Sequence, residues 1–282
     1  MDTITRAMAT KLGDLWKQPV TVDNRPGGNE IIGALAVAKA PNDGYTLILV
    51  SDATLSLNPL LYTKLPYDPV KEFTPIGRVA VSNMAFVVPA SMPVKTFQEF
   101  VAYAKANPGK VPYASTGLGN STHLAMEWLA HEANVNMLHV PYKGLAPIIT
   151  DLMGSQVQAA FGSVSVLAPY VETGKLKALA ISGPKRAAAM PNVPTFKELG
   201  YPDFEASYYM AILAPGGLAQ DIRNKISTDI RAVTADPAFR KTYMDAFALD
   251  AVNESPEQFS AFLRQERAIV EKKVKLSGVK LD

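Results

Sequence analysis

The sequence predicts an α/β protein with two domains, and three observations carry this prediction. Apolar segments of strand length alternate with segments of helical periodicity along the chain, as in proteins with largely parallel sheets. The chain has 282 residues, 48% of them hydrophobic, and domains usually contain roughly 100 to 200 residues each. Polar loops follow several predicted strands, and open α/β sheets bind ligands at the carboxyl ends of their strands. We therefore expect ligand-binding loops at strand ends.

The first half of the chain contains one strand with a clear burial pattern. Residues 45–50 form a continuous apolar run, which is typical of a strand that is covered on both faces and paired on both edges. The small polar residues at 51–54 follow directly, so they should lie at its carboxyl end. The other predicted elements of this half are helices at 3–16, 31–39 and 97–106 and strands at 20–22 and 84–88.

The second half continues the alternation. Strands are predicted to end at Ser115 and to lie at 138–140, 157–161, 179–181 and 206–213; helices are predicted at 148–153, 166–172, 220–234 and 256–276. This order favours a first domain formed by residues 1–107 and 207–282, and a second formed by residues 108–206. Polar loops at 51–54 and 115–122 would then lie on different domains, and a cleft between the domains is the natural ligand site.

The stretch 113–127 joins a strand to a helix through a loop suited to an anion. Two glycines let the backbone approach a ligand, and three polar side chains offer hydrogen bonds at the helix start. These residues are Gly117, Gly119, Asn120, Ser121 and Thr122. No lysine follows the glycines, so the loop is not a nucleotide P-loop, and a small carboxylate at the helix N-terminus is the better prediction. An ordinary capped helix after a glycine-rich turn is the alternative interpretation.

Composition and charge argue against several classes of protein. The formal net charge is +2, without a long basic block, so nucleic acid is not an expected partner. No apolar run approaches the roughly 20 residues that cross a bilayer, and Met1 is followed by polar residues rather than a signal-peptide core. The absence of cysteine excludes disulfides, thiolate metal sites and cysteine nucleophiles.

The histidines and serines raise two further hypotheses. His123 and His131 would lie about two turns apart on one helix, which is too far for them to share a metal ion, so neither a metal nor another cofactor is expected. A serine hydrolase would use Ser121 or Ser163 as its nucleophile. The sequence contains no G-x-S-x-G elbow, so we expect no catalytic residues.

Several motifs in one order carry a resemblance to a known family. They are residues 22–28 (VDNRPGG), 41–47 (PNDGYTL), 58–62 (NPLLY), 64–69 (KLPYDP), 113–115 (YAS), 139–144 (HVPYKG) and 191–195 (PNVPT). The chain resembles, from Met1 to Asp282, the solute receptors of tripartite tricarboxylate transporters, also called the Bug family. The resemblance implies a two-domain, periplasmic-binding-protein-like (type II) fold that closes on a small organic acid. It also implies a periplasmic location and membrane permease subunits as partners, and we expect a monomer.

The resemblance implies that backbone amides, hydroxyl groups and ordered water hold the ligand carboxylate. The candidate ligand-binding residues are Ser51, Asp52, Ala53, Thr54, Ser115, Thr116, Gly119, Asn120, Ser121, Thr122, Ser163 and Tyr208. Tyr208 is included because aromatic rings commonly line small-molecule clefts. A periplasmic ligand sensor of the same fold stays open as an alternative function, because the receptor sequence does not separate uptake from sensing.

Three positions depart from the family pattern. Asp52 stands where neutral polar residues are usual, and a carboxylate there would repel a dianion and favour a ligand with an amine, ring nitrogen, amide or hydroxyl group. Gly162 and Ser163 stand where the family often has an acidic residue. Asp2 matches the start of the first helix in the family, so the natural product is expected to carry a signal, a short strand and a glycine-rich turn before it.

Overall fold

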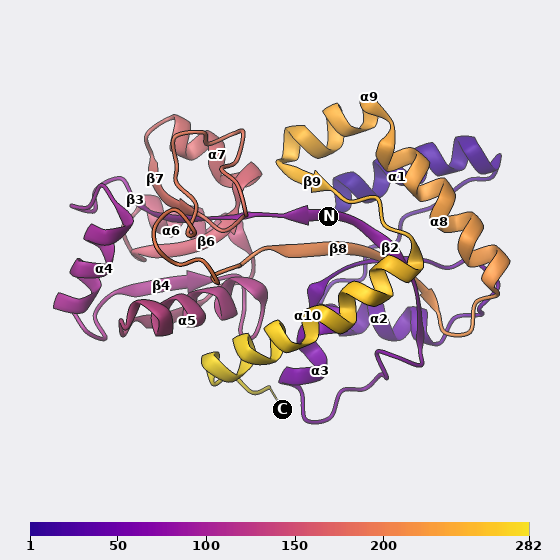
Figure 1. The fold of residues 1–282 in the computed structure, drawn as a ribbon, viewed down its shortest axis with the longest axis horizontal. Coiled ribbons are helices and arrows are strands. Elements are labelled where there is room, and N and C mark those ends of the chain that lie inside the picture. The colour runs from indigo at the N-terminus through magenta and orange to yellow at the C-terminus, as the bar shows by residue number, and fades with distance from the viewer. Residues whose placement is uncertain (282) are drawn as a thin grey trace. The chain divides into compact units, whose positions relative to one another are not determined.

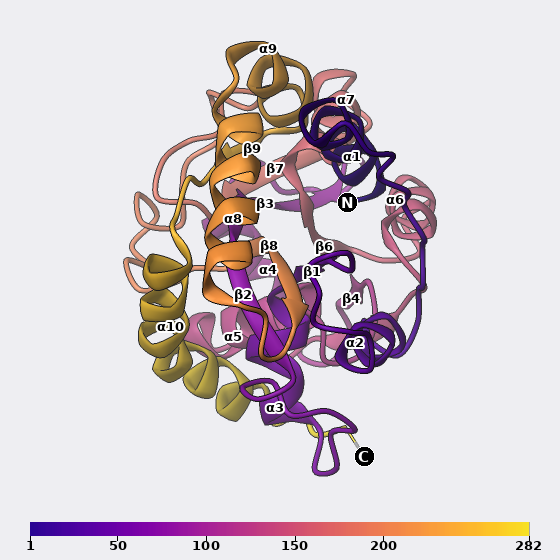
Figure 2. The same cartoon turned by 90° about the vertical axis from the view of Figure 1, so that its right-hand side faces the viewer.

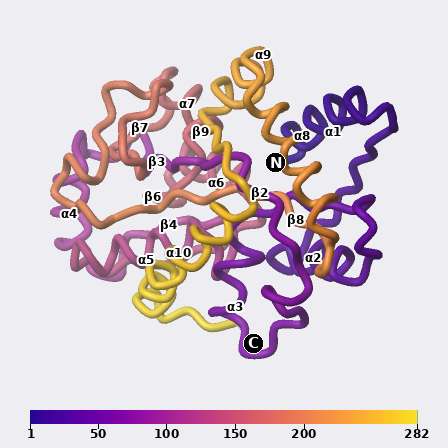
Figure 3. The backbone as a smooth tube through the Cα atoms, turned by 45° about the vertical axis from the view of Figure 1, so that its right-hand side comes forward, coloured from indigo at the N-terminus to yellow at the C-terminus, as the bar shows by residue number. Residues whose placement is uncertain are grey.

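The computed structural model describes residues 1–281, which form two compact units. Unit 1 contains residues Met1–Val81, Tyr208–Glu271 and the C-terminal residues from Lys280, and unit 2 contains Ser82–Ser207 and Lys272–Val279. In Figure 3, the indigo-to-purple and orange-to-yellow parts of the chain make up most of unit 1, and the magenta-to-salmon part makes up most of unit 2. The first boundary therefore falls at Val81, earlier than the boundary at residue 107 predicted from the sequence.

Unit 1 is built on a four-stranded sheet with the strand order β1-β8-β2-β9. Its strands are β1 (Ile48–Ser51), β2 (Phe73–Ser82), β8 (Tyr208–Pro215) and β9 (Leu249–Ala251). Its helices are α1 (Asp2–Trp16), α2 (Ile31–Ala38), α3 (Asn58–Leu61), α8 (Gln220–Ala235), α9 (Pro237–Phe239) and the first part of α10 (Pro256–Ser277), with π-helical turns at Ala53–Leu57 and Arg240–Met244 and a 3-10 turn at Asp245–Phe247. α1 lies beside α8, and α2 lies beside β1 (Figures 1 and 2).

Strand β8 separates two hydrophobic cores in unit 1. Successive side chains of a strand point to opposite faces of the sheet. Met210 and Ile212 belong to a core shared with α1 and α8, whereas Tyr209 and Ala211 belong to a second core shared with α2 and α10. This explains why the segment is apolar without alternation: both of its faces are covered.

Unit 2 is built on a five-stranded sheet with the strand order β5-β4-β6-β3-β7. Its strands are β3 (Met84–Pro89), β4 (Pro112–Ser115), β5 (Leu138–Pro141), β6 (Ala159–Ser163) and β7 (Leu176–Ile181). Its helices are α4 (Phe97–Ala106), α5 (Ser121–Ala133), α6 (Leu145–Met153) and α7 (Val164–Glu172). Phe86 of β3 lies at the centre of its aromatic core, with ring centroids of Phe97, Phe100 and Phe161 at 5.6, 4.9 and 5.3 Å.

The two sheets are mixed rather than largely parallel. β4 pairs in parallel with both β5 and β6, as the alternation of strands and helices predicts. β3 is antiparallel to β6 and β7, and β1 is antiparallel to β8. The prediction of largely parallel sheets was wrong at these pairs, because the partners are distant in sequence and no local pattern records their direction.

Helix positions agree closely with the sequence predictions, and strand predictions were less accurate. The strand predicted at 45–50 begins only at Ile48 and lies at the edge of its described sheet, while Tyr45 is 80% exposed. Residues 20–22, predicted as a strand, belong to no strand. Strand β2 was not predicted, and Pro75 and Gly77 interrupt its apolar pattern.

Candidate functional site

The carboxyl group of a partly buried residue, Glu30, lies at the end of β1, where the sequence predicts an anion-binding loop. We call residues Ser51–Thr54 the first loop. The Ser51 backbone N–H donates to both carboxyl oxygens of Glu30, each at 3.1 Å, and the Thr54 hydroxyl donates to Glu30 Oε2 at 2.8 Å. The Ala53 N–H donates to Ser51 Oγ at 3.2 Å. These donors of the first loop are therefore already bonded within unit 1.

Glu30 reaches the first loop through an unusual backbone. Asn29 and Glu30 both have a left-handed conformation, with φ of 51° and 72°. Such backbone is unfavourable for residues other than glycine and persists where the surroundings hold it. Fully buried Asn58 supplies that support, because its Nδ2 donates to the Asn29 carbonyl at 2.9 Å and its Oδ1 accepts from Asn29 Nδ2 at 2.7 Å. The Tyr67 hydroxyl donates to the Thr54 carbonyl at 2.7 Å and fixes the far end of the loop.

Desolvation raises the pKa values of two side chains in this cluster, Glu30 and Tyr67. It raises the pKa of the Glu30 carboxyl group above the ordinary value, although the hydrogen bonds from Ser51 and Thr54 act in the opposite direction. Burial also raises the pKa of Tyr67 to about 12, with Glu30 contributing to the shift. The cluster is thus a partly desolvated region that contains an acidic side chain.

The acidic candidate within the first loop, Asp52, is 6% exposed and precedes the π-helical turn Ala53–Leu57. Its charge contributes to the raised pKa of Tyr209, which burial dominates. Tyr209 is a core residue whose hydroxyl lies 2.8 Å from Ser56 Oγ, and Ser56 also donates to Glu266 at 2.8 Å. Tyr208 is partly buried beside the core formed with α1 and α8, and its contact with a ligand stays a prediction.

The second candidate loop, Ser115–Thr122, belongs to unit 2 and leads from β4 into α5. Asn120 is the N-cap of α5: its Oδ1 accepts from the backbone N–H groups of Thr122 and His123, both at 3.1 Å. Its Nδ2 donates to the Thr116 hydroxyl at 2.6 Å, and the Thr122 hydroxyl accepts from the Thr116 N–H at 2.9 Å. The Gly119 N–H donates to Nδ1 of His123 at 3.1 Å. This loop is therefore held by neutral groups.

Two stacked histidines lie beneath the second loop. The rings of His123 and His139 are 3.9 Å apart between centroids, and His139 Nε2 is 2.7 Å from the fully buried Ser115 Oγ. Burial and the neighbouring His139 lower the pKa of His123 to about 4, and burial lowers the pKa of His139. His123 Nε2 lies 3.9 Å from Glu127, which accepts a hydrogen bond from the buried Tyr113 hydroxyl. The loop thus rests on neutral imidazoles.

The C-terminal edge of the parallel strands in unit 2 collects three helix starts. β4, β5 and β6 run parallel and are followed by α5, α6 and α7. Asn120, Gly144 and Ser163 are the respective N-caps, so the positive ends of three helices begin at this edge. Ser163, predicted as a candidate from the sequence, is placed at the same edge as Ser115, at the ends of neighbouring strands. A small anion is suited to this edge on electrostatic grounds.

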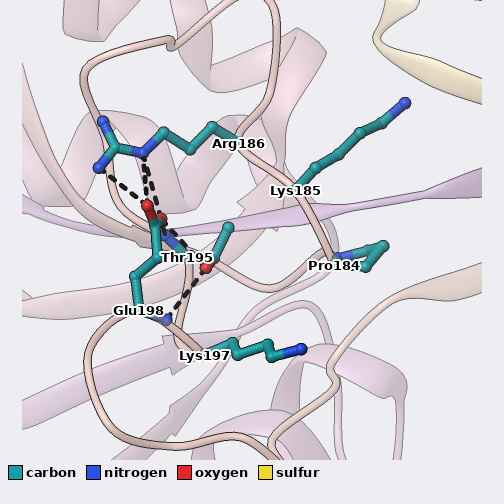
Figure 4. Close-up of a pocket in the computed structure, with 6 residues that line it drawn as sticks. All are labelled: Pro184, Lys185, Arg186, Thr195, Lys197 and Glu198. Atoms are coloured by element: carbon teal, nitrogen blue, oxygen red, sulfur yellow. Dashed lines mark hydrogen bonds and ion pairs between the residues drawn. The ribbon is translucent and has the colours of Figure 1, made fainter.

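An open pocket elsewhere in unit 2 has a different composition. It has a volume of about 580 Å3 and is lined by Pro184, Lys185, Arg186, Thr195, Lys197 and Glu198. Figure 4 shows the Arg186 guanidinium facing the Glu198 carboxylate, and Lys197 pointing away from that pair. Arg186 lowers the pKa of Glu198 to about 2. The pocket shares no residue with those predicted from the sequence, and its arginine already has a partner.

The two further hypotheses from the sequence concern a serine nucleophile and a metal ion. A close contact joins His139 to Ser115, which is fully buried. Residues 1–281 contain no group of three or more potential metal ligands close enough to hold an ion. None of the helices in that range is both long and apolar enough to cross a bilayer.

Sequence reasoning missed Glu30, Asn58 and His139 as parts of the two loops. Glu30 follows the motif Arg-Pro-Gly-Gly, which the sequence indicates only as turn chemistry. In the structure the left-handed turn that begins at Gly27 and Gly28 continues through Asn29 and Glu30, which also have positive φ. The sequence signal for this turn was the pair of glycines directly before Asn29 and Glu30.

Comparison with known proteins defines the class. The family described as tripartite tricarboxylate transporter family receptor matches residues 4–277. Protein BugT of Bordetella pertussis is 33% identical over 94% of this chain and 81% of its own length. The solved structure of Rhodopseudomonas palustris MatC (Rpa3494) with bound malate is 26% identical, with a TM-score of 0.83, and the match covers 97% of this chain and 94% of that chain. The R. palustris Rpa4515 structure with adipate is 29% identical, with a TM-score of 0.91, covering 99% and 93%.

These matches show that the chain is a solute-binding protein with the periplasmic-binding-protein fold. The chain belongs to the tripartite tricarboxylate transporter receptor family.

Proposed function

We propose that this receptor captures a small organic acid outside the cytoplasm and delivers it to the membrane subunits of a tripartite transporter. In this proposal it works in the periplasm as a monomer, binds no nucleic acid and needs no cofactor. The adipate and malate in the structures of two relatives support a carboxylic acid as the ligand.

The observation that carries this proposal is the edge of the unit 2 sheet. Three helix N-termini meet the ends of three parallel strands there, and the second loop is neutral. We propose that the ligand carboxylate binds at this edge, with Thr116, Gly119, Ser121 and Ser163 as contacts. Asn120 and Thr122 hold the loop in shape, because their side-chain hydrogen bonds are made within it.

Transport without catalysis is favoured by the arrangement of the serines and histidines. Ser115, which lies beside His139, is buried and also donates to the Gly117 carbonyl at 3.0 Å. A nucleophile must be accessible to its substrate. We therefore propose a binding function and no hydrolysis.

The test is a thermal-shift screen of mono- and dicarboxylic acids, amino acids and aromatic acids, followed by calorimetry. A ligand at 100 times its dissociation constant adds about 2.7 kcal/mol to the free energy of unfolding. At least one acid is expected to raise the melting temperature and bind with 1:1 stoichiometry. No binding by any acid, together with turnover of an ester or amide, would contradict the proposal.

Ser121→Ala locates the site within unit 2. Loss of one charge-assisted hydrogen bond is expected to weaken binding of the best acid about tenfold. Ser91→Ala is the matched control, because Ser91 is an exposed serine of the same unit that hydrogen-bonds Ser155. Equal affinities of both variants and the parent would place the carboxylate elsewhere.

A further inference from the structure

The first loop differs from an open anion site because a carboxyl group of the chain already lies in it. Three hydrogen bonds reach Glu30: two from the Ser51 N–H, shared between the carboxyl oxygens, and one from the Thr54 hydroxyl. A carboxylate bound by a backbone amide and a hydroxyl group is the arrangement expected for a bound organic acid. Here the acid is part of the protein.

The surrounding structure holds this carboxyl group against opposing costs. The left-handed backbone of Asn29 and Glu30 lowers the stability of the folded state, and desolvation of the Glu30 carboxyl group is a further cost. Asn58 offsets part of these costs through its hydrogen bonds with the backbone carbonyl and the side-chain amide of Asn29. A side chain that merely pointed to solvent would not need this support.

The charged groups near the first loop also disfavour an external anion there. The interactions that shift the pKa of Glu30 are desolvation and the hydrogen bonds of Ser51 and Thr54, and none of these comes from a cation. Asp52, directly after Ser51 in the chain, adds a second carboxyl group that is almost fully buried. A ligand carboxylate at the first loop would lie close to the carboxyl groups of Glu30 and Asp52, and the donors of Ser51 and Thr54 are already bonded to Glu30.

We infer that Glu30 is an internal occupant of the first loop: its carboxyl group takes the place that a second ligand carboxylate would need. The residue thereby determines specificity. The first loop accepts a hydrogen-bond donor, best an ammonium group, instead of an anion.

This inference rests on the proposed function for its ligand class. The ligand group that suits the first loop is a hydrogen-bond donor such as a protonated amine, so the preferred ligand class is an amino acid rather than a dicarboxylate. Dicarboxylates such as the adipate and malate bound in two relatives bind this protein less well than their amino analogues.

The internal-occupant role is tested first, without any transported ligand. Glu30→Gly removes the carboxyl group, suits the left-handed backbone and exposes the donors of Ser51 and Thr54. Added acetate should then fill the vacated place and raise the melting temperature of the variant by about 2 to 4 °C at about five times its dissociation constant.

Two controls accompany the acetate experiment. Glu30→Gln keeps the shape of the side chain and should show no acetate response beyond that in chloride at equal ionic strength, and neither should the parent protein. A saturable response in Glu30→Gly alone supports the inference. Equal responses in all three proteins, or none in Glu30→Gly, would overturn it.

The ligand class is tested with pairs of acids that differ only in one terminal group. The pairs are succinate with 3-aminopropanoate, glutarate with 4-aminobutanoate, and adipate with 5-aminopentanoate. Calorimetry should show that the parent prefers the amino acid of the pair that fits best, and that Glu30→Gly shifts the affinity ratio toward the dicarboxylate about tenfold or more.

The outcomes separate this inference from the proposed function. Preference of the parent for dicarboxylates, an unchanged ratio in the variant, or no binding of all six compounds overturns the ligand class. The acetate result decides independently whether Glu30 occupies the loop. Failure of the proposed function itself would appear as the absence of any bound acid in the wider screen.

Discussion

The first and second loops each join the end of a strand to the start of a helical segment, yet they are held by opposite chemistry. The first loop has its amide and hydroxyl donors bonded to the Glu30 carboxyl group. The second loop is closed by the amide side chain of Asn120, the hydroxyl of Thr122 and the imidazole of His123. An anion is therefore compatible with the second loop and in competition with Glu30 at the first.

This difference shows that a polar loop after a strand is not by itself an anion site. What matters is which donors remain after the chain has satisfied its own acceptors. Four experiments can sharpen or break the comparison, and they are described from the largest expected effect to the smallest.

Asn58→Ala should have the largest effect, and it should fall on the first loop. The substitution removes three hydrogen bonds from a fully buried side chain to Asn29 and Tyr67. Each lost partner leaves a desolvated group, so we expect a loss of about 2 to 4 kcal/mol in the free energy of unfolding, measured by urea denaturation. Relative to the parent, the variant should exchange the Ser51 amide hydrogen faster, whereas exchange in the second loop should not change. A loss below about 1 kcal/mol would mean that Asn58 does not hold the Glu30 backbone.

Asn120→Ala removes the N-cap of α5 and should destabilise the protein by about 1 to 2 kcal/mol. Ligand affinity should fall about tenfold, because the amides of the second loop lose their orientation. Asn120→Asp is the informative control: it keeps the capping oxygen and the stability, but its negative charge should still weaken binding of an anion. If the aspartate variant binds the acid as the parent does, the carboxylate does not lie near this helix start.

The two loops should respond to acid in opposite directions. His123 has a folded-state pKa of about 4, below the ordinary 6.5, so its contribution to stability is complete above pH 6.5 and is lost as the pH falls toward 4. The pKa of Glu30 is raised in the folded state, so its contribution is present at low pH and is lost as the pH rises through that raised value.

Melting temperatures measured between pH 4 and 8 in the parent and two variants separate these contributions. His123→Asn keeps an acceptor for the Gly119 N–H, and it should flatten the decrease in stability between pH 6.5 and 4. Glu30→Gln should remove the opposing contribution and steepen that decrease. A parent and a His123→Asn variant with superimposable profiles would show that His123 does not titrate there on unfolding.

Asp52→Asn is expected to have the smallest effect. It removes a charge near the first loop and keeps the shape, so the affinity for a dicarboxylate should rise about threefold relative to its amino analogue, less than in Glu30→Gly. The comparison uses the same matched pairs by calorimetry. A larger change than that of Glu30→Gly would make Asp52, not Glu30, the main determinant of selectivity.

The sequence predicted the helices and the existence of both loops well, because these depend on local patterns. The predicted helix 97–106 coincides with α4, where Thr96 accepts from the Glu99 N–H as its cap. The second loop could be located from Gly117, Gly119 and Asn120, whose roles follow from turn and capping chemistry.

What could not be predicted depends on contacts between distant residues. The pairing of β1 with β8 joins Ile48 to Leu213, and no local signal gives its direction or the edge position of β1. The carboxyl group of Glu30 lies in the first loop only because a left-handed turn redirects it, and Asn58 holds that turn from a later helix. Asp52 was predicted to matter for charge, whereas the acid that accepts from the Ser51 N–H is Glu30, which the sequence did not indicate.

The discontinuity of unit 1 has a consequence for the order in which the chain acquires structure. All five strands of the unit 2 sheet come from residues 84–181, so this sheet can form while the ribosome is still adding later residues. The sheet of unit 1 must wait for β8, the strand that separates its two cores and pairs with β1. In cell-free translation, nascent chains stalled after residue 207 should therefore contain a protease-resistant fragment from unit 2 while the segment before it is still digested.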